Sequence, residues 1–162
     1  MANQDAAFGM RPVKRIGGTP YTGGQSRYRI AANYGTSIFQ GDMVAQVTGG
    51  GIEVHADGGT VPIVGVFNGC QYTDPTTKEQ KFSNFYPAST NASDIIAFII
   101  DDPMVIFEIQ AAIAFPVADL LGNFDIVVNI YSNITLYFVS NNCYKNYTIS
   151  LQITSLGFWG FG

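Results

Sequence analysis

The chain has 162 residues and a net charge of −4, a length that fits one domain, or one domain with an appendage. Its charged fraction is only 12%, whereas 14% of its residues are aromatic and 18 are glycine, a balance that favours an all-β protein with many turns. No apolar run is long enough to span a membrane, and the first ten residues lack the basic start and apolar stretch of a signal peptide.

Residues 1–25 predict an extended amino-terminal arm. Glycine and proline recur too often for a helical or strand period, yet apolar residues are scattered among them. Residues 1–30 contain five cations against Asp5 alone, giving +4, whereas the remainder contains three lysines against eleven carboxylates, giving −8. Isolated apolar anchors between basic residues suit a segment that lies along another surface, although a disordered terminus would have a similar composition.

The next segments alternate with the period of two that strands require. Residues 26–33 place Arg27 and Arg29 on one face and Tyr28 and Ile30 on the other. Residues 35–69 contain three short apolar runs separated by glycine-rich turns, which predicts an antiparallel meander. The three runs are Met43–Val47, Ile52–His55 and Val61–Phe67.

Further strands and loops are expected up to residue 109. Asn68-Gly69 predicts a turn into a strand at Cys70–Thr73, and 74–81 and 87–93 are expected to be polar loops. Ile95–Ile100 and Met104–Ile109 are predicted to pair across a turn at Asp101-Asp102-Pro103. The first of these strands is apolar on both faces, which is typical of a central strand.

The remainder of the chain offers one short helix and more strands. Pro116–Gly122 has an early proline and a terminal glycine, which suits a helix of two turns at most. Strands are expected at Asp125–Tyr131, 134–140 and 146–153, and the apolar terminus Ser155–Gly162 has to be buried. The fold class is therefore all-β, a small β-barrel or sandwich body over 26–162 with an extended arm over 1–25.

No constellation for catalysis, a metal or a cofactor is found. His55 is the only histidine, and without a second imidazole we expect a solvent-facing residue beside a turn rather than a metal ligand or base. Asp101 and Asp102 are neighbours in a turn, so they do not face one cleft as an acid–base pair would. Cys70 and Cys143 are expected to be free thiols, and the three glycosylation sequons are expected to be coincidental.

Four segments of the first 44 residues carry a resemblance to a known family. They are Asp5–Pro12 (DAAFGMRP), Gly18–Gly23, Ser26–Ile30 and Ile38–Val44 (IFQGDMV). This pattern resembles the head decoration, or cement, proteins of tailed phages, particularly marine and cyanobacterial ones. The later segments 65–74, 85–89 and 101–110 also resemble that family, and the meander is similar to the β-tulip cores of lambda-type decoration proteins. The resemblance covers residues 4–128, and 129–162 depart from it.

The resemblance implies a virion protein on the outer surface of the capsid head, synthesised in the host cytoplasm. Its partners would be the major capsid protein and itself, with a trimer favoured over a dimer, and its mechanism would be binding rather than turnover. No direct contact with nucleic acid or a membrane is expected, because the body is acidic. The expected capsid contacts are the anchors and bases of the arm: Phe8, Met10, Arg11, Lys14, Arg15, Ile16 and Tyr21.

A second class of function stays open. A ligand- or carbohydrate-binding β-domain of a phage tail or spike would show aromatic residues gathered with Asn and Asp. Tyr131, Tyr137 and Tyr144 could form such a cluster.

Overall fold

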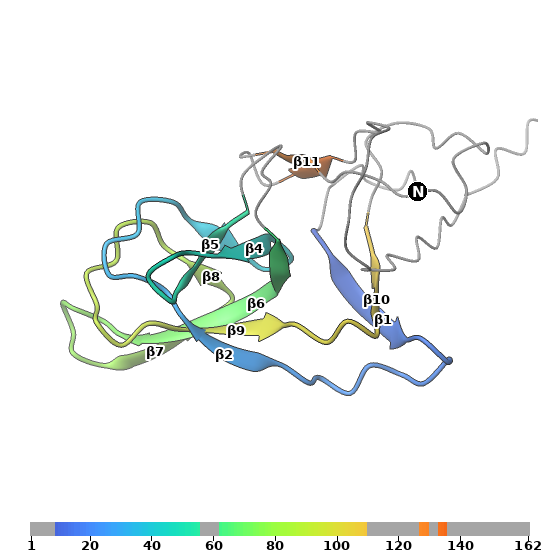
Figure 1. The fold of residues 1–162 in the computed structure, drawn as a ribbon. Coiled ribbons are helices and arrows are strands. Elements are labelled where there is room, and N and C mark those ends of the chain that lie inside the picture. Colours follow the sequence, from blue (N-terminus) through green and yellow to red (C-terminus); the bar gives the residue numbers. More distant parts are fainter. Residues whose placement is uncertain (1–8, 56–61, 110–126, 130–132, 136–162) are drawn as a thin grey trace, which may run out of the picture.

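The computed structural model describes residues 9–55, 62–109, 127–129 and 133–135, and this part of the chain is all-β without a helix. The fold class predicted from composition and period is therefore confirmed. The short helix expected at Pro116–Gly122 lies outside the described residues, as do the strand expected at 146–153, the apolar terminus and all but the first two residues of the strand expected at 134–140. Figure 1 shows the arrangement of the strands.

The strands fall into one large sheet and three pairs. In chain order they are β1 (Arg11–Arg15), β2 (Ser26–Arg29), β3 (Ile38–Phe39), β4 (Met43–Gln46), β5 (Ile52–Val54), β6 (Ile63–Thr73), β7 (Gln80–Ser83), β8 (Phe85–Tyr86), β9 (Ile96–Ile100), β10 (Val105–Glu108), β11 (Val127–Asn129) and β12 (Asn133–Thr135). The large sheet has six strands in the order β2-β9-β6-β4-β5, with β7 also paired to β6. The pairs are β1-β10, β3-β8 and β11-β12, and every pairing in the structure is antiparallel.

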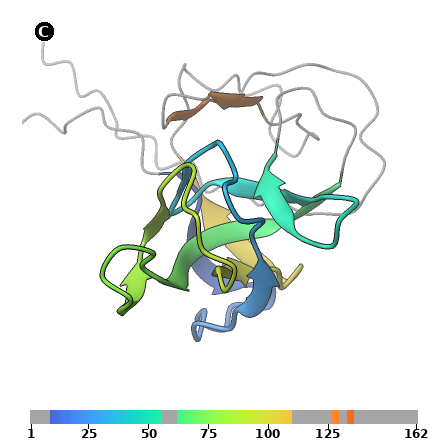
Figure 2. The ribbon, with the colours of Figure 1, turned by 90° about the vertical axis from the view of Figure 1, so that its left-hand side faces the viewer.

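The large sheet curls without closing into a barrel (Figure 2). Its two outer strands, β2 and β5, approach each other where Gly51 lies against the carbonyl of Arg29, and a Cβ on Gly51 would be only 3.0 Å from that oxygen. The Tyr34 hydroxyl accepts a hydrogen bond of 3.1 Å from the Val54 N–H of β5. This bond satisfies a backbone donor that an open sheet edge would otherwise expose.

The sheet has an apolar cluster on each face. The inner cluster includes Ile30, Val44, Phe67 and Ile99, and the pair β3-β8 contributes its buried side chains Ile38 and Tyr86. The outer cluster consists of Met10, Met43, Val66 and Ile109. Successive residues of β4 therefore go to opposite clusters, as a period of two requires, and Met43, Val44 and Ala45 are all buried.

Three predicted connections are wrong. The segment 43–67 is not a simple meander, because β6 pairs with β4 and leaves β5 at the edge. Asn68-Gly69 is not a turn but a bulge within the long strand β6, where Gly69 has a φ of 146°. β9 and β10 do not pair with each other: β9 lies centrally between β2 and β6, as its apolar faces predicted, and β10 pairs with β1.

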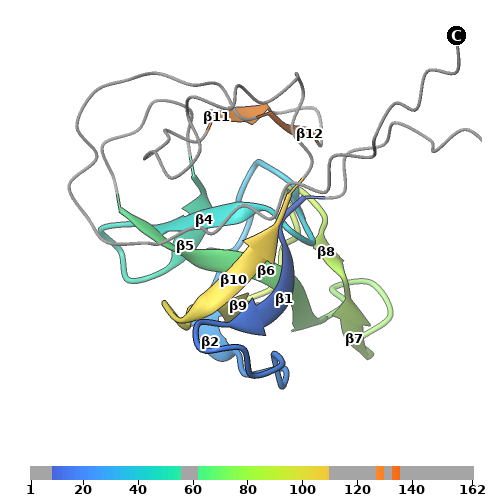
Figure 3. The same cartoon turned by 90° about the vertical axis from the view of Figure 1, so that its right-hand side faces the viewer.

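The described part of the expected arm, residues 9–25, is also folded onto its own chain. Residues Arg11–Arg15 form β1, which pairs with β10 to give a two-stranded unit that we call the ribbon. A tight turn follows, in which the Arg15 N–H donates to the Thr19 carbonyl at 2.8 Å and Lys14 forms a bridge with Pro20. Residues 11–15 of the expected arm are therefore paired within their own chain in this structure. Figure 3 shows the ribbon, with β1 and β10 side by side.

Candidate interaction surfaces

The ribbon is anchored to the sheet through two glycines. The Met10 N–H donates a hydrogen bond of 2.9 Å to the Gly41 carbonyl. Gly9 and Gly41 both have positive φ, and a Cβ on Gly9 would be 2.9 Å from the Cα of Gly41. Only glycine permits this approach without displacing backbone. Two of the segments that carry the family resemblance, Asp5–Pro12 and Ile38–Val44, therefore meet in the fold.

The turn that receives Met10 is itself held by hydrogen bonds. The Asp42 carboxylate accepts from the Phe39 N–H at 2.7 Å, while the Gly41 N–H donates to the Phe67 carbonyl at 2.8 Å. Burial raises the pKa of the Asp42 carboxyl, and the bond from Phe39 offsets part of that effect. Because Met10 is only 5% exposed and packs in the outer cluster, it anchors the ribbon and cannot contact a partner in this conformation.

Apolar side chains are exposed on the ribbon and at its turn end. Val13, Ile16 and Met104 are each 41–43% exposed. The Ile16 N–H donates to the Met104 carbonyl at 2.7 Å, so two of these residues lie directly across the ribbon from each other. Large apolar side chains that stay exposed among the described residues make this unit a candidate contact surface.

Two of the three predicted basic contacts already have anions in their own chain. Arg11 forms an ion pair with Glu108 at 2.6 Å, and Arg15 forms one with Asp102 at 3.0 Å. Lys14 is half-buried and forms no ion pair within the described residues. Exposed pairs of this kind contribute little to stability, so both arginines remain available to exchange partners.

Tyr21 and the acidic turn lie near the end of the ribbon. The Tyr21 hydroxyl donates to the Gly24 carbonyl at 2.7 Å, and burial, followed by the charges of Asp102 and Asp101, raises the pKa of this phenol. Asp101 accepts hydrogen bonds from the Ser26 and Tyr28 hydroxyls at 3.0 and 2.9 Å. The two carboxylates thus hold separate neighbours. The Asp102 carbonyl accepts from the Val105 N–H at 3.1 Å, so the chain turns over Pro103 and Met104, but this turn does not join a hairpin as predicted.

A second surface lies on the outer face of β2, β9, β6 and β7, away from the ribbon. The strand registers place Arg29, Ile96, Gln71 and Phe82 in one row across these four strands, and Arg27 and Phe98 beside them. We call these six residues the outer platform. Phe82 is 70% exposed, and Ile96 and Phe98 belong to neither apolar cluster of the described residues. Figure 1 shows these strands in the lower left of the molecule.

A third, smaller apolar surface lies on the pair β3-β8. Phe39 and Phe85 stack with ring centroids 6.0 Å apart and with 16° between their planes, and both are more than two-fifths exposed. Such a pair stabilises the short strands even without a partner, because offset aromatic contacts are favourable in themselves.

The histidine and the cysteine considered as catalytic or metal-binding residues are both buried in the fold. His55 is buried at 6% exposure, so the expectation of a solvent-facing imidazole is wrong. The backbone N–H of His55 donates to the Met43 carbonyl at 3.0 Å. Cys70 is a free, buried thiol, and burial raises its pKa to about 11. Cys143 lies outside the described residues. Within the described residues no group of His, Cys, Asp and Glu could hold a metal ion, and no helix could cross a membrane.

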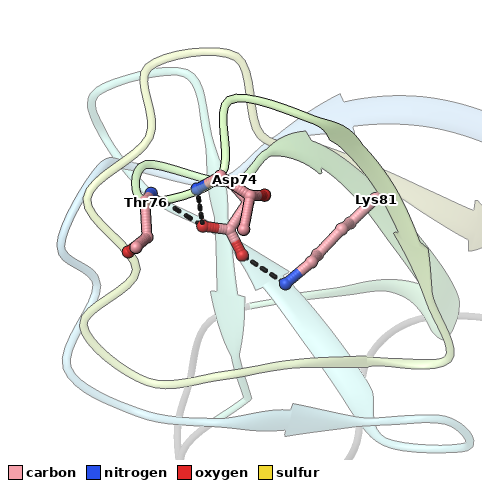
Figure 4. A network of polar contacts seen from close by, with 4 residues as sticks. Asp74, Thr76 and Lys81 are labelled. Atoms are coloured by element: carbon pink, nitrogen blue, oxygen red, sulfur yellow. Dashed lines mark hydrogen bonds and ion pairs between the residues drawn. The ribbon is translucent and has the colours of Figure 1, made fainter.

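The turn between β6 and β7 is closed by one carboxylate (Figure 4). Asp74 forms an ion pair with Lys81 and accepts from the Thr76 N–H at 2.7 Å and the Thr77 N–H at 3.2 Å. These bonds, with the one from Lys81 the largest contribution, lower the pKa of Asp74 to about 2. The network organises a loop and faces no cleft in the described part of the chain.

Comparison of the chain with family models, curated proteins and solved structures finds no match. Among the expected contact residues, Phe8 lies outside the described residues, as do Tyr131, Tyr137 and Tyr144 of the alternative sugar site. The outer platform was missed as a unit. The alternation of 26–33 correctly placed Arg27 and Arg29 on one face, but the rest of the row depends on registers between strands far apart in sequence.

Proposed function

We propose that this chain is a structural protein of a tailed-phage head that binds the outer surface of the capsid and cements neighbouring capsid subunits. The proposal starts from the resemblance of segments within residues 4–128. The observation that carries it further is the ribbon, where Val13, Ile16 and Met104 are exposed beside Lys14, Arg11 and Arg15. Apolar side chains flanked by cations suit an acidic protein surface with shallow apolar pockets.

The folded ribbon changes the proposed mode of binding. β1 and β10 pair only with each other among the described strands, but the end of β1 is also bridged through Lys14 to Pro20. The outer edge of β10 is therefore the one at which a capsid strand could add. A preformed ribbon loses less conformational entropy on binding than a free arm would. The major capsid protein is the proposed partner, and repeated copies on a lattice would convert modest single contacts into high avidity.

The proposed assembly is a trimer at three-fold positions of the shell, with a dimer at two-fold positions as the second choice. The proposed place of action is the outside of the virion, after synthesis in the host cytoplasm, with no direct contact to nucleic acid or a membrane. No catalysis is invoked, because binding alone would stabilise the shell. No specific observation in the described residues favours the alternative of a sugar-binding tail module.

Co-sedimentation with purified heads that lack this protein tests the proposal. We expect the wild-type chain to bind heads saturably and the variant Ile16→Asp to bind at least about tenfold more weakly, because a carboxylate would enter an apolar contact facing an acidic partner. The matched control is Thr48→Asp, which makes the same charge change at an exposed position in the turn between β4 and β5. Absence of wild-type binding, or equal binding by both variants, would contradict the proposal.

A further inference from the structure

We propose that the outer platform is a second docking surface and that it binds an acidic protein segment bearing apolar side chains. The surface is separate from the ribbon, and the inference does not depend on the proposed capsid function. It is carried by the row of side chains that the strand registers place together and by the position of two cations at one end of that row.

The apolar part of the platform has no covering layer among the described residues. The opposite face of the same strands is fully used: Tyr28, Ala97, Cys70 and Tyr72 all pack in the inner cluster. On the outer face, Ile96 and Phe98 are only half-buried, and Phe82 is the most exposed large apolar side chain of the described residues, at 70%. Neighbouring strands are about 4.8 Å apart, so the row from Arg29 to Phe82 spans about 14 Å.

The cations set the chemistry of the partner. Arg27 and Arg29 are exposed on the strand at the edge of the sheet, and neither forms an ion pair within the described part of the chain. The Arg27 guanidinium lies 5.9 Å from the centre of the Phe98 ring, a distance at which a cation–π interaction stabilises its position over the ring. Carboxylates at one end of a bound segment would meet these arginines, while its apolar side chains would cover Ile96 and Phe82.

The charge distribution favours a protein over a nucleic acid. Exposed aromatics with arginines on a sheet also suit stacked bases, but a strand of phosphates requires a basic track across the whole face. Beside the row, where β6 runs into its turn, the charges are mixed. Asp94 accepts from the Thr73 hydroxyl at 2.6 Å, and the turn contains Asp74 and Glu79 together with Lys78 and, at the start of β7, Lys81. The cations and carboxylates of this turn balance each other, so a strand of phosphates would meet an excess of positive charge only at Arg27 and Arg29 on this face of the described residues. An acidic segment that places its charge only at the arginine end therefore fits better.

The test is a titration of the full chain with a short synthetic peptide in which glutamate alternates with leucine, followed by amide NMR. We expect saturable shifts confined to β2, β9, β6 and β7, and about fivefold weaker binding by Arg29→Gln or Phe82→Ser. The matched control is Gln46→Glu, which makes the same charge change as Arg29→Gln at an exposed position on β4.

Four outcomes would overturn the inference. They are shifts that map to the ribbon instead, equal weakening by the control, tighter binding of a single-stranded oligothymidylate than of the peptide, and equal binding of a peptide with lysine in place of glutamate. Self-association that buries Phe82, detected by sedimentation of wild type against Phe82→Ser, would also reject an acidic segment as the occupant. Because no capsid is used, failure here leaves the proposed capsid contact of the ribbon standing.

Discussion

The ionised carboxylate of Asp74 holds the backbone of the turn between β6 and β7 in place. This carboxylate accepts from the Thr76 and Thr77 N–H groups and pairs with Lys81, so the turn between β6 and β7 depends on one charge. A turn of this kind was expected from the Asp-Pro sequence at 74–75, because aspartate readily accepts hydrogen bonds from the following backbone. The lysine partner, seven residues further on, could not be assigned without the pairing of β6 and β7.

The pKa of Asp74 gives a pH prediction with a definite sign. The folded value of about 2 lies below the ordinary value of 3.8, so ionised Asp74 favours the folded turn. That contribution is fully present above pH 3.8 and is lost as the pH falls through about 2. We expect amide exchange of residues 76–79 to accelerate over this range relative to β9, measured by NMR. In Asp74→Asn the exchange should be fast at all pH values, and a turn indifferent to pH in the wild type would refute the role.

Cys70 provides a second prediction at this scale. Burial of the side chain raises the thiol pKa to about 11, and the thiolate is the species that reacts with disulfide reagents. In a Cys143→Ser background, the native protein should react with a thiol reagent at mildly alkaline pH more than about 100-fold more slowly than the unfolded protein. Equal rates before and after unfolding would show that Cys70 is accessible in the native state.

Among the strands, their positions were predictable but their partners were not. Period-two alternation correctly placed strands at Ser26–Arg29 and Met43–Gln46, because each segment has to divide its side chains between two environments. The strand Ile96–Ile100 was found instead from a short run that is apolar on both faces. Strand pairing depends on contacts between residues distant in sequence. Two glycines within β6 permit contacts that a larger residue would prevent. Gly65 brings β6 against β9, and Gly69 allows the bulge that lets β6 continue where the sequence predicted a turn.

Gly65 gives the prediction at the scale of elements. A Cβ at this position would lie 2.4 Å from the Ile100 carbonyl oxygen and 2.8 Å from a methyl group of Ile99, so β6 and β9 would have to separate. Gly65→Ala should reduce the free energy of unfolding by about 1–3 kcal/mol, measured by urea denaturation. Gly49→Ala is the matched control, because nothing lies within 4 Å of its added Cβ and the change should be nearly neutral. Equal effects of both changes would show that this approach of backbones is not tight.

For the whole molecule, the amino-terminal segment was the least predictable part. Glycines at 9, 17 and 18 flank β1 so closely that its five residues are too short to show a strand pattern in the sequence. The ion pair between Arg11 and Glu108 joins positions 97 residues apart, which local patterns cannot predict. Composition therefore identified a basic, anchor-bearing segment but not the surface that it covers. Of the predicted contact residues within the described range, Arg11, Lys14, Arg15 and Ile16 are on the ribbon, while Met10 has become part of the core.

Because β1 and Met10 pack against the rest of the chain, deletion of residues 1–25 would not test capsid binding alone. A free arm could be removed without loss of the body, but removal of β1 would uncover β10 and empty the position of Met10 beside Met43 and Val66. Loss of capsid binding after deletion would then follow from unfolding alone. Substitutions on the exposed side of the ribbon, which leave Met10 in place, avoid that confusion.

Met10→Ala separates the two descriptions of the segment. If Met10 packs in the outer cluster in solution, truncating its 5%-exposed side chain should reduce the free energy of unfolding by about 2–3 kcal/mol. Val13→Ala, three residues further on in β1 and 43% exposed, should cost less than about 0.5 kcal/mol. The free energies of unfolding of both variants are measured by urea denaturation, and their dependence on urea concentration should equal that of the wild type. Equal and negligible effects would mean that the segment leaves the sheet in solution, and the contact with a capsid would then belong to a free arm, with Met10 again among its anchors.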